Sequence, residues 1–502
     1  MRPPLSALCQ ATAVSIATIL GTGILGLPVS LHSSGIRPFF LTFTLALFAQ
    51  LAVVIATVEV LQRAHKDPQP ATSDYHPLPN EDPSSAQPLP SHAPPHETAP
   101  SLHSIAHHFL PNKPLRITFN AIVVVHFVFI LAAYALAGPQ AFAALIPALK
   151  RAPRWALPTV FLLVNVLAVI CLDRALLPSL TIATLFKAAL LSSIVFVVFG
   201  RGLAIHEDVT NDWRPAALID PFLMGTFALN GVVNIMPVTF QACLESTRAP
   251  DGTIPPLDPP FLRAYRMSTV AAIVICFILN VSWCVGILLC VPQTSHTIRS
   301  VAAASGNHDM TVLSNSIQLT LNAVNATHSD ASLTQANELG QISTIPLIEV
   351  LQARGDQLDW LMALLVNIFI ALSITVSFLV MSLGLKHFLD GQARDRTTST
   401  TSMAYDSYRI LQYAQHYLFV LVIAVFNPTG LFKIMEGITG LSLNVEAGLF
   451  ILYMLHIGRR MNKQIPAPLS HTHVLVVLWY AGAYFGSAVL VDILFYLPHA
   501  FL

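Results

Sequence analysis

The chain has 502 residues, of which 54% are hydrophobic and only 10% are charged, and its formal net charge is zero. A soluble domain carries roughly 25% charged residues, so this composition excludes a soluble globular protein and indicates one whose solvent is lipid. The zero net charge gives no sign of the basic field with which proteins attract nucleic acid. None of the six cysteines forms a Cys-x-x-Cys pair, so neither a disulfide framework nor a zinc site is indicated, and no cofactor is expected.

Hydropathy predicts an all-α membrane protein with eleven transmembrane helices. A helix needs about 20 mostly apolar residues to cross the hydrocarbon core of a bilayer. The predicted spans lie near residues 11–31, 38–61, 117–137, 155–172, 175–199, 219–241, 269–291, 358–385, 414–426, 431–457 and 473–497. The ninth reaches spanning length only if the amphipathic stretch from about Tyr408 is included. The first is interpreted as a retained span, because no small-residue cleavage site of a signal peptide follows it.

Two connections between the predicted spans are long. Residues 62–116 hold ten prolines between Pro68 and Pro100, and we expect this segment to be disordered and to offer room for a cytosolic partner. Its histidines are interpreted either as part of a biased linker or as groups that bind metal or sense pH. The second connection, about 292–357, is polar and carries a glycosylation sequon at Asn325.

The distribution of basic residues predicts the orientation in the membrane. With a cytosolic N-terminus, cytosolic segments hold sixteen of the 26 lysines and arginines, opposite segments hold nine, and Lys187 lies within a span. The positive-inside rule therefore predicts a cytosolic N-terminus and a lumenal or extracellular C-terminus, with Asn325 on the face where glycosylation occurs. No sorting signal distinguishes a vacuolar or lysosomal membrane from the plasma membrane.

Two of the predicted spans contain poor helix formers at bilayer depth. The first includes ILGTGILGLP, residues 19–28, and the sixth includes GTFALNGVVNIMP, residues 225–237. Non-helical backbone is tolerated at that depth only where it is buried in protein or lines a cavity, and transporters use such discontinuous helices to bind substrates. The five-span separation predicts two inverted repeats of five helices plus one extra helix. The alternative is close helix packing through small residues.

These motifs resemble those of the amino acid/auxin permeases, a family within the amino acid–polyamine–organocation superfamily. The resemblance depends on GTGILGLP and GTFALNGVVNIMP, with support from SLHSIAHHFLPNKP before the third span and AYALAGPQAFAALIP at its end. It implies a leucine-transporter-like fold, which is a five-plus-five inverted repeat with broken first and sixth helices. It also implies that the substrate meets the residues Gly21, Thr22, Gly23, Ile24, Thr226, Phe227, Asn230 and Gly231.

The predicted organisation follows this repeat. Residues 1–10 form a short cytosolic tail, and residues 11–199 form the first repeat with its insertion at 62–116. The second repeat covers residues 200–457 and includes the lumenal or extracellular loop at 292–357. Residues 458–502 hold the extra helix.

The first span also bears on the coupling ion. Sodium-coupled members of the family have an asparagine four residues before the first motif glycine, where this chain has Ala17. A methyl group cannot coordinate sodium, so a proton is the expected coupling ion. Ser373, Thr375 and Ser377 of the eighth span still offer hydroxyls to a cation, and the alternative is that they bond to their own helix.

Lys187 is the most informative ionisable residue. It lies at the centre of the fifth predicted span, roughly 18 Å from either interface, which is too far for its side chain to reach water. A charge at that depth is costly and needs a partner or an aqueous cavity. In some proton-coupled members of the superfamily a fifth-span lysine takes the place of a sodium ion between the first and eighth helices, and Lys187 resembles it. The alternative is a lysine permanently tied to carbonyls or to an acid.

Three further side chains at bilayer depth have two interpretations each. His126, in the third span, is a candidate proton carrier or a hydrogen-bonded structural histidine. Glu446, in the tenth span, is a candidate partner of Lys187 or a gate on the cytosolic side. The hydroxyl of Tyr134 either reaches a substrate carboxylate or lies at the membrane interface.

These features together predict a secondary transporter that moves a small or neutral amino acid with a proton by alternating access. The alternative is a sensor or receptor with the same fold, which binds an amino acid and signals through a cytosolic partner. An enzyme is not predicted, because the sequence has no G-x-S-x-G or H-E-x-x-H motif and no intramembrane pair of aspartates.

Overall fold

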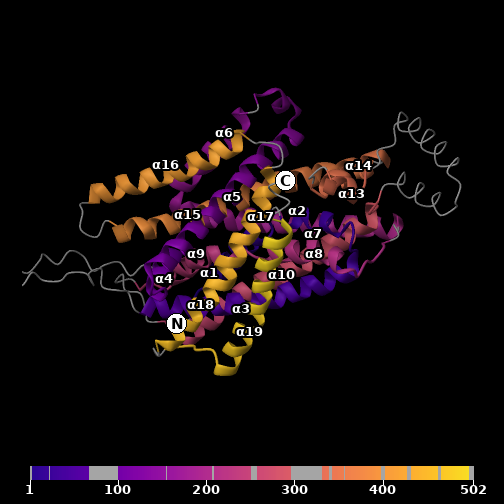
Figure 1. Ribbon diagram of the computed structural model, residues 1–502. Helices are drawn as coiled ribbons and strands as arrows, with labels where there is room; N and C mark the ends of the chain where they lie inside the picture. Colours follow the sequence, from indigo (N-terminus) through magenta and orange to yellow (C-terminus); the bar gives the residue numbers. More distant parts are fainter. Residues whose placement is uncertain are drawn as a thin grey trace, which may run out of the picture.

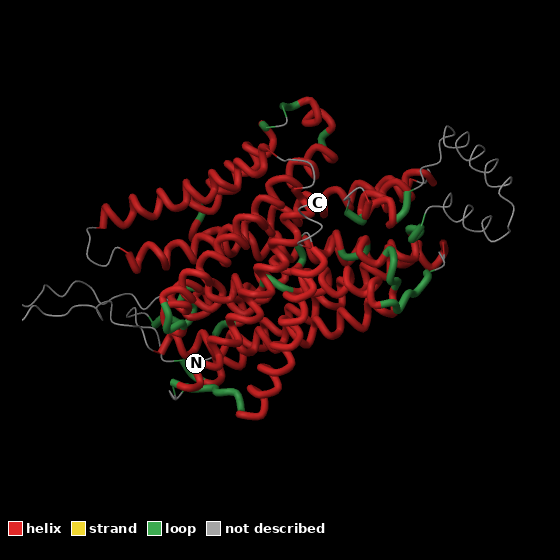
Figure 2. Tube along the Cα trace, in the orientation of Figure 1, coloured by secondary structure: helices red, strands yellow, loops and turns green. Residues whose placement is uncertain are grey.

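All regular secondary structure in the part of the chain that the structure describes is helical. This computed structural model describes residues 3–21, 23–66, 100–153, 155–205, 209–249, 257–294, 331–338, 342–354, 357–396, 402–426, 431–461 and 465–496. Within these ranges there is no strand (Figure 2). Asn325 and residues 67–99 of the proline-rich insertion lie outside the described residues, whereas residues 62–66 and 100–116, which were also predicted to be disordered, are largely helical.

Ten α-helices lie among the described residues up to Cys290. These are α1 (Leu5–Ile19), α2 (Gly23–Gly26), α3 (Ile36–Lys66), α4 (Leu102–Phe109), α5 (Lys113–Leu145), α6 (Ala156–Cys171), α7 (Asp173–Ile205), α8 (Pro215–Leu229), α9 (Val232–Glu245) and α10 (Pro259–Cys290). Two short 3₁₀ turns, η1 (Val29–Leu31) and η2 (Pro147–Arg151), follow α2 and α5.

The second half adds a long pair of helices and a group interrupted by π-helical turns. The elements are α13 (Leu333–Glu338), α14 (Thr344–Arg354), α15 (Gln357–Arg396), α16 (Ser402–Phe426), α17 (Leu431–Leu443), η3 (Asn444–Phe450), α18 (Ile451–Arg460), α19 (His471–Val491) and η4 (Asp492–Tyr496). Of these, η3 and η4 are π-helical.

Nine helical stretches among the described residues are long and apolar enough to cross a membrane. They correspond to the second, third and fifth to eleventh predicted spans, and one of them joins α8 and α9. The first and fourth predicted spans correspond to the shorter apolar helices α1 and α6, with 15 and 16 residues. The chain is therefore a multi-pass helical membrane protein, and nine of its eleven predicted spans have the expected length and hydropathy.

Several helices extend beyond the ends predicted from hydropathy. The eighth span was predicted at 358–385, whereas α15 continues to Arg396, and the third was predicted at 117–137, whereas α5 runs over Lys113–Leu145. The ninth, α16, begins at Ser402 and so includes the amphipathic stretch before residue 414. A helix keeps its hydrogen bonds after it leaves the hydrocarbon core, where polar residues end the hydropathy signal.

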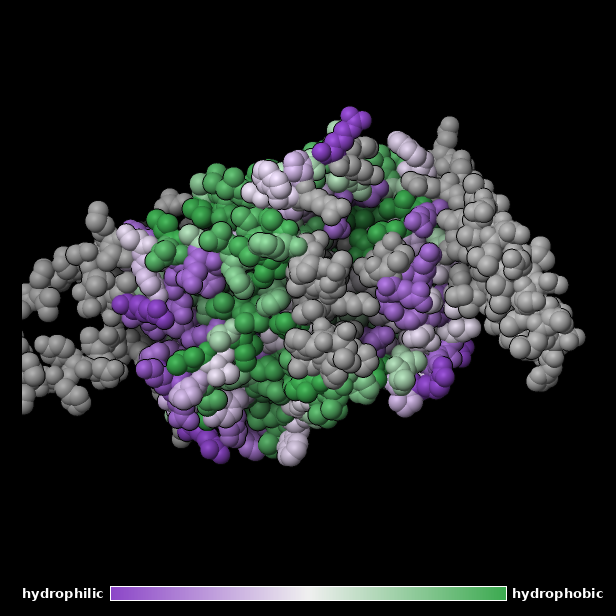
Figure 3. Space-filling model, turned by 45° about the horizontal axis from the view of Figure 1, so that its top comes forward, coloured by the Kyte–Doolittle hydropathy of each residue, from purple (hydrophilic) through white to green (hydrophobic). Residues whose placement is uncertain are grey.

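The apolar surface has the distribution expected of a protein in a bilayer. Large hydrophobic side chains of α7 face outward, with Phe196 82% and Ile182 71% exposed. On the face shown in Figure 3, hydrophobic residues occupy the middle and hydrophilic residues gather toward the two ends. This apolar band is suited to contact with lipid tails, which are as apolar as these side chains.

The helices form one bundle around α1 and α5. Figure 1 shows α4 and the N-terminus at one end of the bundle and α13 and α14 at the other. Helix α1 packs against α7, α9, α10 and α15, and α5 packs against α15, α16 and α17. The interrupted segments after α1 and between α8 and α9 are therefore enclosed by other helices, where irregular backbone is tolerated in a membrane.

A buried ionic cluster joins α3 to the last two helices near the end that carries α4. Glu59 of α3 is 1% exposed and accepts hydrogen bonds from Nη2 of Arg63 at 2.8 Å and from Nε of Arg459 at 2.6 Å. Its second oxygen accepts from the backbone N–H of Leu469 at 3.0 Å. Arg63 in turn donates to the carbonyl of Gly458 at 2.9 Å. Pairing satisfies a carboxylate that would be costly to bury alone.

One hydrogen bond joins α19 to α8, and its removal is expected to have a modest cost. The Tyr484 hydroxyl lies 2.5 Å from Oγ1 of Thr226, which donates its own proton to the carbonyl of Phe222, so Tyr484 is the donor. We expect Tyr484→Phe to destabilise the protein by about 0.6–1 kcal/mol, because Thr226 keeps its bond to Phe222. Thermal unfolding in detergent, followed by tryptophan fluorescence, measures the change.

Tyr480→Phe is the matched control for this measurement. Its hydroxyl donates to the carbonyl of Leu45 at 2.9 Å on the exposed side of the same helix, whereas Tyr484 is 7% exposed. A larger loss of stability for Tyr480→Phe than for Tyr484→Phe would contradict the assignment of the Thr226 bond as the buried one.

Candidate functional site

The first helix of the chain is interrupted in the middle of the bundle. The last backbone bond at the end of α1 joins the N–H of Leu20 to the carbonyl of Ile16 at 2.9 Å, and helical structure begins again at Gly23. Glycine suits this segment because neighbouring groups approach its backbone closely. A Cβ on Gly21 would meet the Tyr134 hydroxyl, and a Cβ on Gly23 would lie 2.9 Å from the Cα of Ala228.

A second interruption separates α8 from α9. Asn230 has an extended backbone, and Gly231 has a φ of 93°, in the left-handed region that glycine adopts without strain. The side-chain oxygen of Asn230 accepts the N–H of Gly231 at 2.8 Å. The amide therefore takes the place of a helical carbonyl, and the chain restarts as α9 at Val232.

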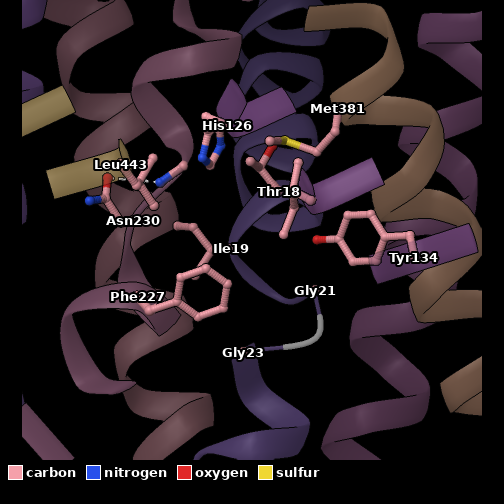
Figure 4. A pocket seen from close by; sticks show the side chains of 12 residues that line it. Thr18, Ile19, Gly21, Gly23, His126, Tyr134, Phe227, Asn230, Met381 and Leu443 are labelled. Atoms are coloured by element: carbon pink, nitrogen blue, oxygen red, sulfur yellow. Dashed lines mark hydrogen bonds between the residues drawn. The ribbon is translucent and has the colours of Figure 1, made fainter. Parts of the chain in front are cut away.

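The two interruptions face each other across a small cavity. Its volume is about 30 Å³, which holds about two water molecules. In Figure 4 the Tyr134 hydroxyl points into the space beside the first interruption, and Phe227 approaches from the opposite side. The cavity is lined by Thr18, Ile19, Gly21, Gly23, His126, Ile130, Tyr134, Phe227, Asn230, Gly231, Met381 and Leu443.

Polar atoms without a protein partner line this cavity. Nδ2 of Asn230 is buried and makes no hydrogen bond to the described residues, and the same holds for both ring nitrogens of His126. The His126 ring faces the backbone of Thr439 on α17, but makes no hydrogen bond of ordinary geometry there. Each unsatisfied buried donor or acceptor costs about 1–3 kcal/mol, so the site favours a ligand with its own polar groups.

Lys187 lies beside the cavity, at the end of α1. It is 0% exposed, and its Nζ donates to Oγ of Ser377 on α15 at 3.3 Å. The Ser377 hydroxyl donates in turn to the carbonyl of Ala17 at 2.9 Å, and Ser373 donates to the carbonyl of Leu20 at 2.8 Å. Helix carbonyls at a C-terminus lack intrahelical donors and carry about half a negative charge, so this position suits a cation.

The polar contacts of Lys187 are few for an ammonium group. An ammonium has three N–H donors, and the one hydrogen bond identified for Lys187 among the described residues goes to Ser377. No carboxylate within the described ranges forms an ion pair with it. A fully desolvated and unpaired charge is costly to bury.

Glu446 lies in the π-helical segment η3, in the tenth predicted span. It is 0% exposed, and neither carboxylate oxygen has a hydrogen-bond partner among the described residues. The hypothesis that it pairs with Lys187 is wrong, because Lys187 donates to Ser377 and Glu446 makes no hydrogen bond to it. A π-helical turn widens a helix locally, and such turns are frequent at functional sites.

The structure brings only part of the predicted site together. Gly21, Gly23, Phe227, Asn230, Gly231 and His126 line the cavity. Ile24 is buried outside the cavity lining, Thr226 bonds to Tyr484, and Thr375 bonds to the carbonyl of Ala371 in its own helix. Thr22 and Asn325 lie outside the described residues.

Several residues that line the cavity could not be predicted from sequence. Thr18, Ile19, Ile130, Met381 and Leu443 are ordinary apolar or hydroxyl residues in apolar helices, and no local pattern marks them. The hydroxyl of Tyr134 was expected either to reach the substrate or to lie at the membrane interface. Its position against Gly21 places it at the cavity.

Comparison with known proteins adds no assignment to this geometry. The chain matches no family model, and no curated protein is significantly similar to it.

Proposed function

We propose that the protein is a secondary active transporter that moves a small or neutral amino acid together with a proton. The observation that carries the proposal is the cavity between two interrupted helices, with a buried lysine at the end of one of them. Discontinuous helices expose backbone N–H groups and carbonyls at bilayer depth, and a zwitterion needs both kinds of partner. The motifs that resemble the amino acid/auxin permeases lie at these same interruptions.

The proposed architecture is a five-plus-five inverted repeat with one extra helix. In this assignment α1/α2, α3, α5, α6 and α7 form the first repeat, and α8/α9, α10, α15, α16 and the series α17 to α18 form the second. The opening member of each set is the interrupted one. Helix α19 is then the extra helix, and its bond from Tyr484 to Thr226 ties it to the opening helix of the second repeat.

The proposed binding mode follows from the polarity of the helix ends. The N-terminus of α9, which begins at Val232, carries partial positive charge and suits the substrate carboxylate. Asn230 Nδ2 adds a donor beside it. The carbonyl ends of α1 and α8 suit the substrate amine, and Phe227 and Ile130 supply apolar contacts. A cavity of about 30 Å³ is too small for an amino acid, so binding requires these elements to separate.

The proposed coupling step uses Lys187. When protonated, its ammonium donates to Ser377, whose hydroxyl holds the carbonyl of Ala17 at the end of α1. Loss of the proton removes the charge that this helix end attracts, and α1 is then free to change its position relative to α15. Proton release and movement of the binding-site helix would thus be linked, as alternating access requires.

Uptake into proteoliposomes tests the proposal. We expect the purified protein to accumulate at least one labelled neutral amino acid when the outside is more acidic than the inside, and not when the pH is equal on both sides. A sodium gradient alone should drive no accumulation. Binding of an amino acid without flux under any gradient would contradict transport and favour the sensor alternative.

A further inference from the structure

A second and larger cavity lies away from the proposed transport site. Its volume is about 330 Å³, and it is lined by His103, His107, Lys113, Arg116, Ile117 and Asn120. These residues belong to α4 and to the first two turns of α5, at the end of the bundle that carries the N-terminus (Figure 1). The positive-inside rule predicts that this end faces the cytosol.

The cavity has an excess of positive charge. Lys113 and Arg116 are basic residues one helical turn apart, and neither forms an ion pair among the described residues. Asp395 of α15 lies against the lining, with its Oδ2 3.0 Å from Nε2 of His103. Asp395 therefore pairs with His103, and Lys113 and Arg116 are left to bind an anion.

The cavity also contains an unsatisfied donor. Nε of Arg116 is buried and has no hydrogen-bond partner among the described residues. A guanidinium presents its N–H groups in a planar fork that matches the oxygens of a phosphate group. Asn120 adds an amide on the next turn of α5, 3.3 Å from Nδ1 of His103. The cavity therefore presents an ammonium from Lys113, a guanidinium from Arg116 and an amide from Asn120 to a phosphate group.

The lipid-facing surface reaches the edge of this cavity. Ile117 is 58% exposed, although it lies only one residue after Arg116, so the bilayer begins where the basic lining ends. A soluble anion would make no apolar contact with Ile117, whereas the first carbons of a lipid tail would pack against it. Basic pockets between helices on the cytoplasmic side of a membrane bind phosphorylated headgroups.

We propose that this cavity binds the phosphorylated headgroup of an anionic lipid of the cytosolic leaflet. The lipid phosphate is held by Lys113 and Arg116, and its tail leaves along Ile117. The lining belongs to α4 and α5, so the bound headgroup joins these two helices, and α4 also contacts α3, α15 and α18. A ligand that binds only the folded protein raises its thermal stability by an amount that grows with the logarithm of its concentration divided by its Kd.

Thermal unfolding of the purified full-length protein in detergent tests this site. The probe is a short-chain phosphatidylinositol bisphosphate, added over a concentration series. We expect it to raise the unfolding temperature of the wild type, and Lys113→Gln/Arg116→Gln to weaken the apparent affinity by at least about tenfold, because two charge-assisted contacts are lost. Lys113→Gln alone, at an exposed position, should give a smaller loss in the same direction.

The matched control removes the same number of charges at the same end of the bundle. Arg263 and Arg266 are also three residues apart near the start of a helix, α10, and lie outside the cavity. Arg263→Gln/Arg266→Gln should respond to the probe as the wild type does. An equal loss in both double variants would overturn the site, since it would reduce the effect to general charge attraction.

Two further additions distinguish the lipid from a soluble phosphate. Short-chain phosphatidylcholine, with the same tails and no net charge, should not raise the unfolding temperature. Inositol trisphosphate, with the headgroup phosphates and no tails, should bind more weakly than the lipid. A soluble inositol phosphate that stabilises as strongly as the lipid would overturn the lipid assignment, as would the absence of any response to the lipid.

Discussion

Lys187→Met is expected to abolish pH-driven uptake while leaving the protein at least as thermally stable as the wild type. The Lys187 side chain is 0% exposed, and its identified hydrogen bond is the 3.3 Å contact with Ser377. Replacing a buried charge with an apolar side chain of similar volume is often neutral or stabilising. A lysine kept for structure alone would not combine unchanged stability with lost coupling, whereas one kept for proton exchange would.

The measurement combines thermal unfolding with uptake at equal and unequal pH. We expect uptake of the variant to fall by at least about tenfold under an inward proton gradient and to lose its response to that gradient. Lys386→Met is the control, since Lys386 lies on α15 beside Asp390, at 3.8 Å, and away from the site. Uptake by Lys187→Met that still follows the pH gradient would remove this residue from the coupling mechanism.

Gly23→Ala is the second change with a large expected effect, and we expect it to lower uptake by at least about tenfold. A Cβ at this position would lie 2.9 Å from the Cα of Ala228, which is backbone and cannot rotate away. The added methyl group must therefore push the interrupted part of the first helix away from α8. The two sets of helix ends that we propose to hold the substrate would no longer close together.

Gly440→Ala is the matched control for this steric argument. Gly440 lies in α17, which contributes Leu443 to the cavity, yet a Cβ at Gly440 would have no atom within 4 Å. Alanine is the better helix former, so this variant should unfold at an equal or higher temperature and transport normally. Equal losses of uptake in the two variants would contradict the proposal that the contact between Gly23 and Ala228 matters.

The two interruptions were predictable from sequence because their causes are local. Glycine, proline and asparagine weaken a helix wherever they occur, and the lipid around them gives irregular backbone no other partner. The ends of α5 and α15 were not predictable in the same way. Hydropathy reports where lipid ends, whereas the helix continues until its hydrogen bonds or its packing fail.

The side chains around the cavity were only partly predictable, because direction depends on packing between distant helices. Thr226 was expected at the site from its motif, but it bonds to Tyr484, which lies 258 residues away in the chain. Met381 and Leu443 face the cavity from α15 and α17, and nothing in their neighbourhoods distinguishes them from lipid-facing residues. Lys187 was identified by its depth and by its resemblance to a fifth-span lysine, and it contacts Ser377 of α15 rather than Glu446.

The most direct test of proton-coupled transport is the pH inside proteoliposomes loaded with a pH-sensitive dye and given substrate from outside. We expect addition of the transported amino acid to acidify the interior of vesicles with the wild-type protein, in step with uptake of labelled substrate, and to leave the pH unchanged with Lys187→Met. Substrate uptake by the wild type with no acidification would contradict proton coupling through this site.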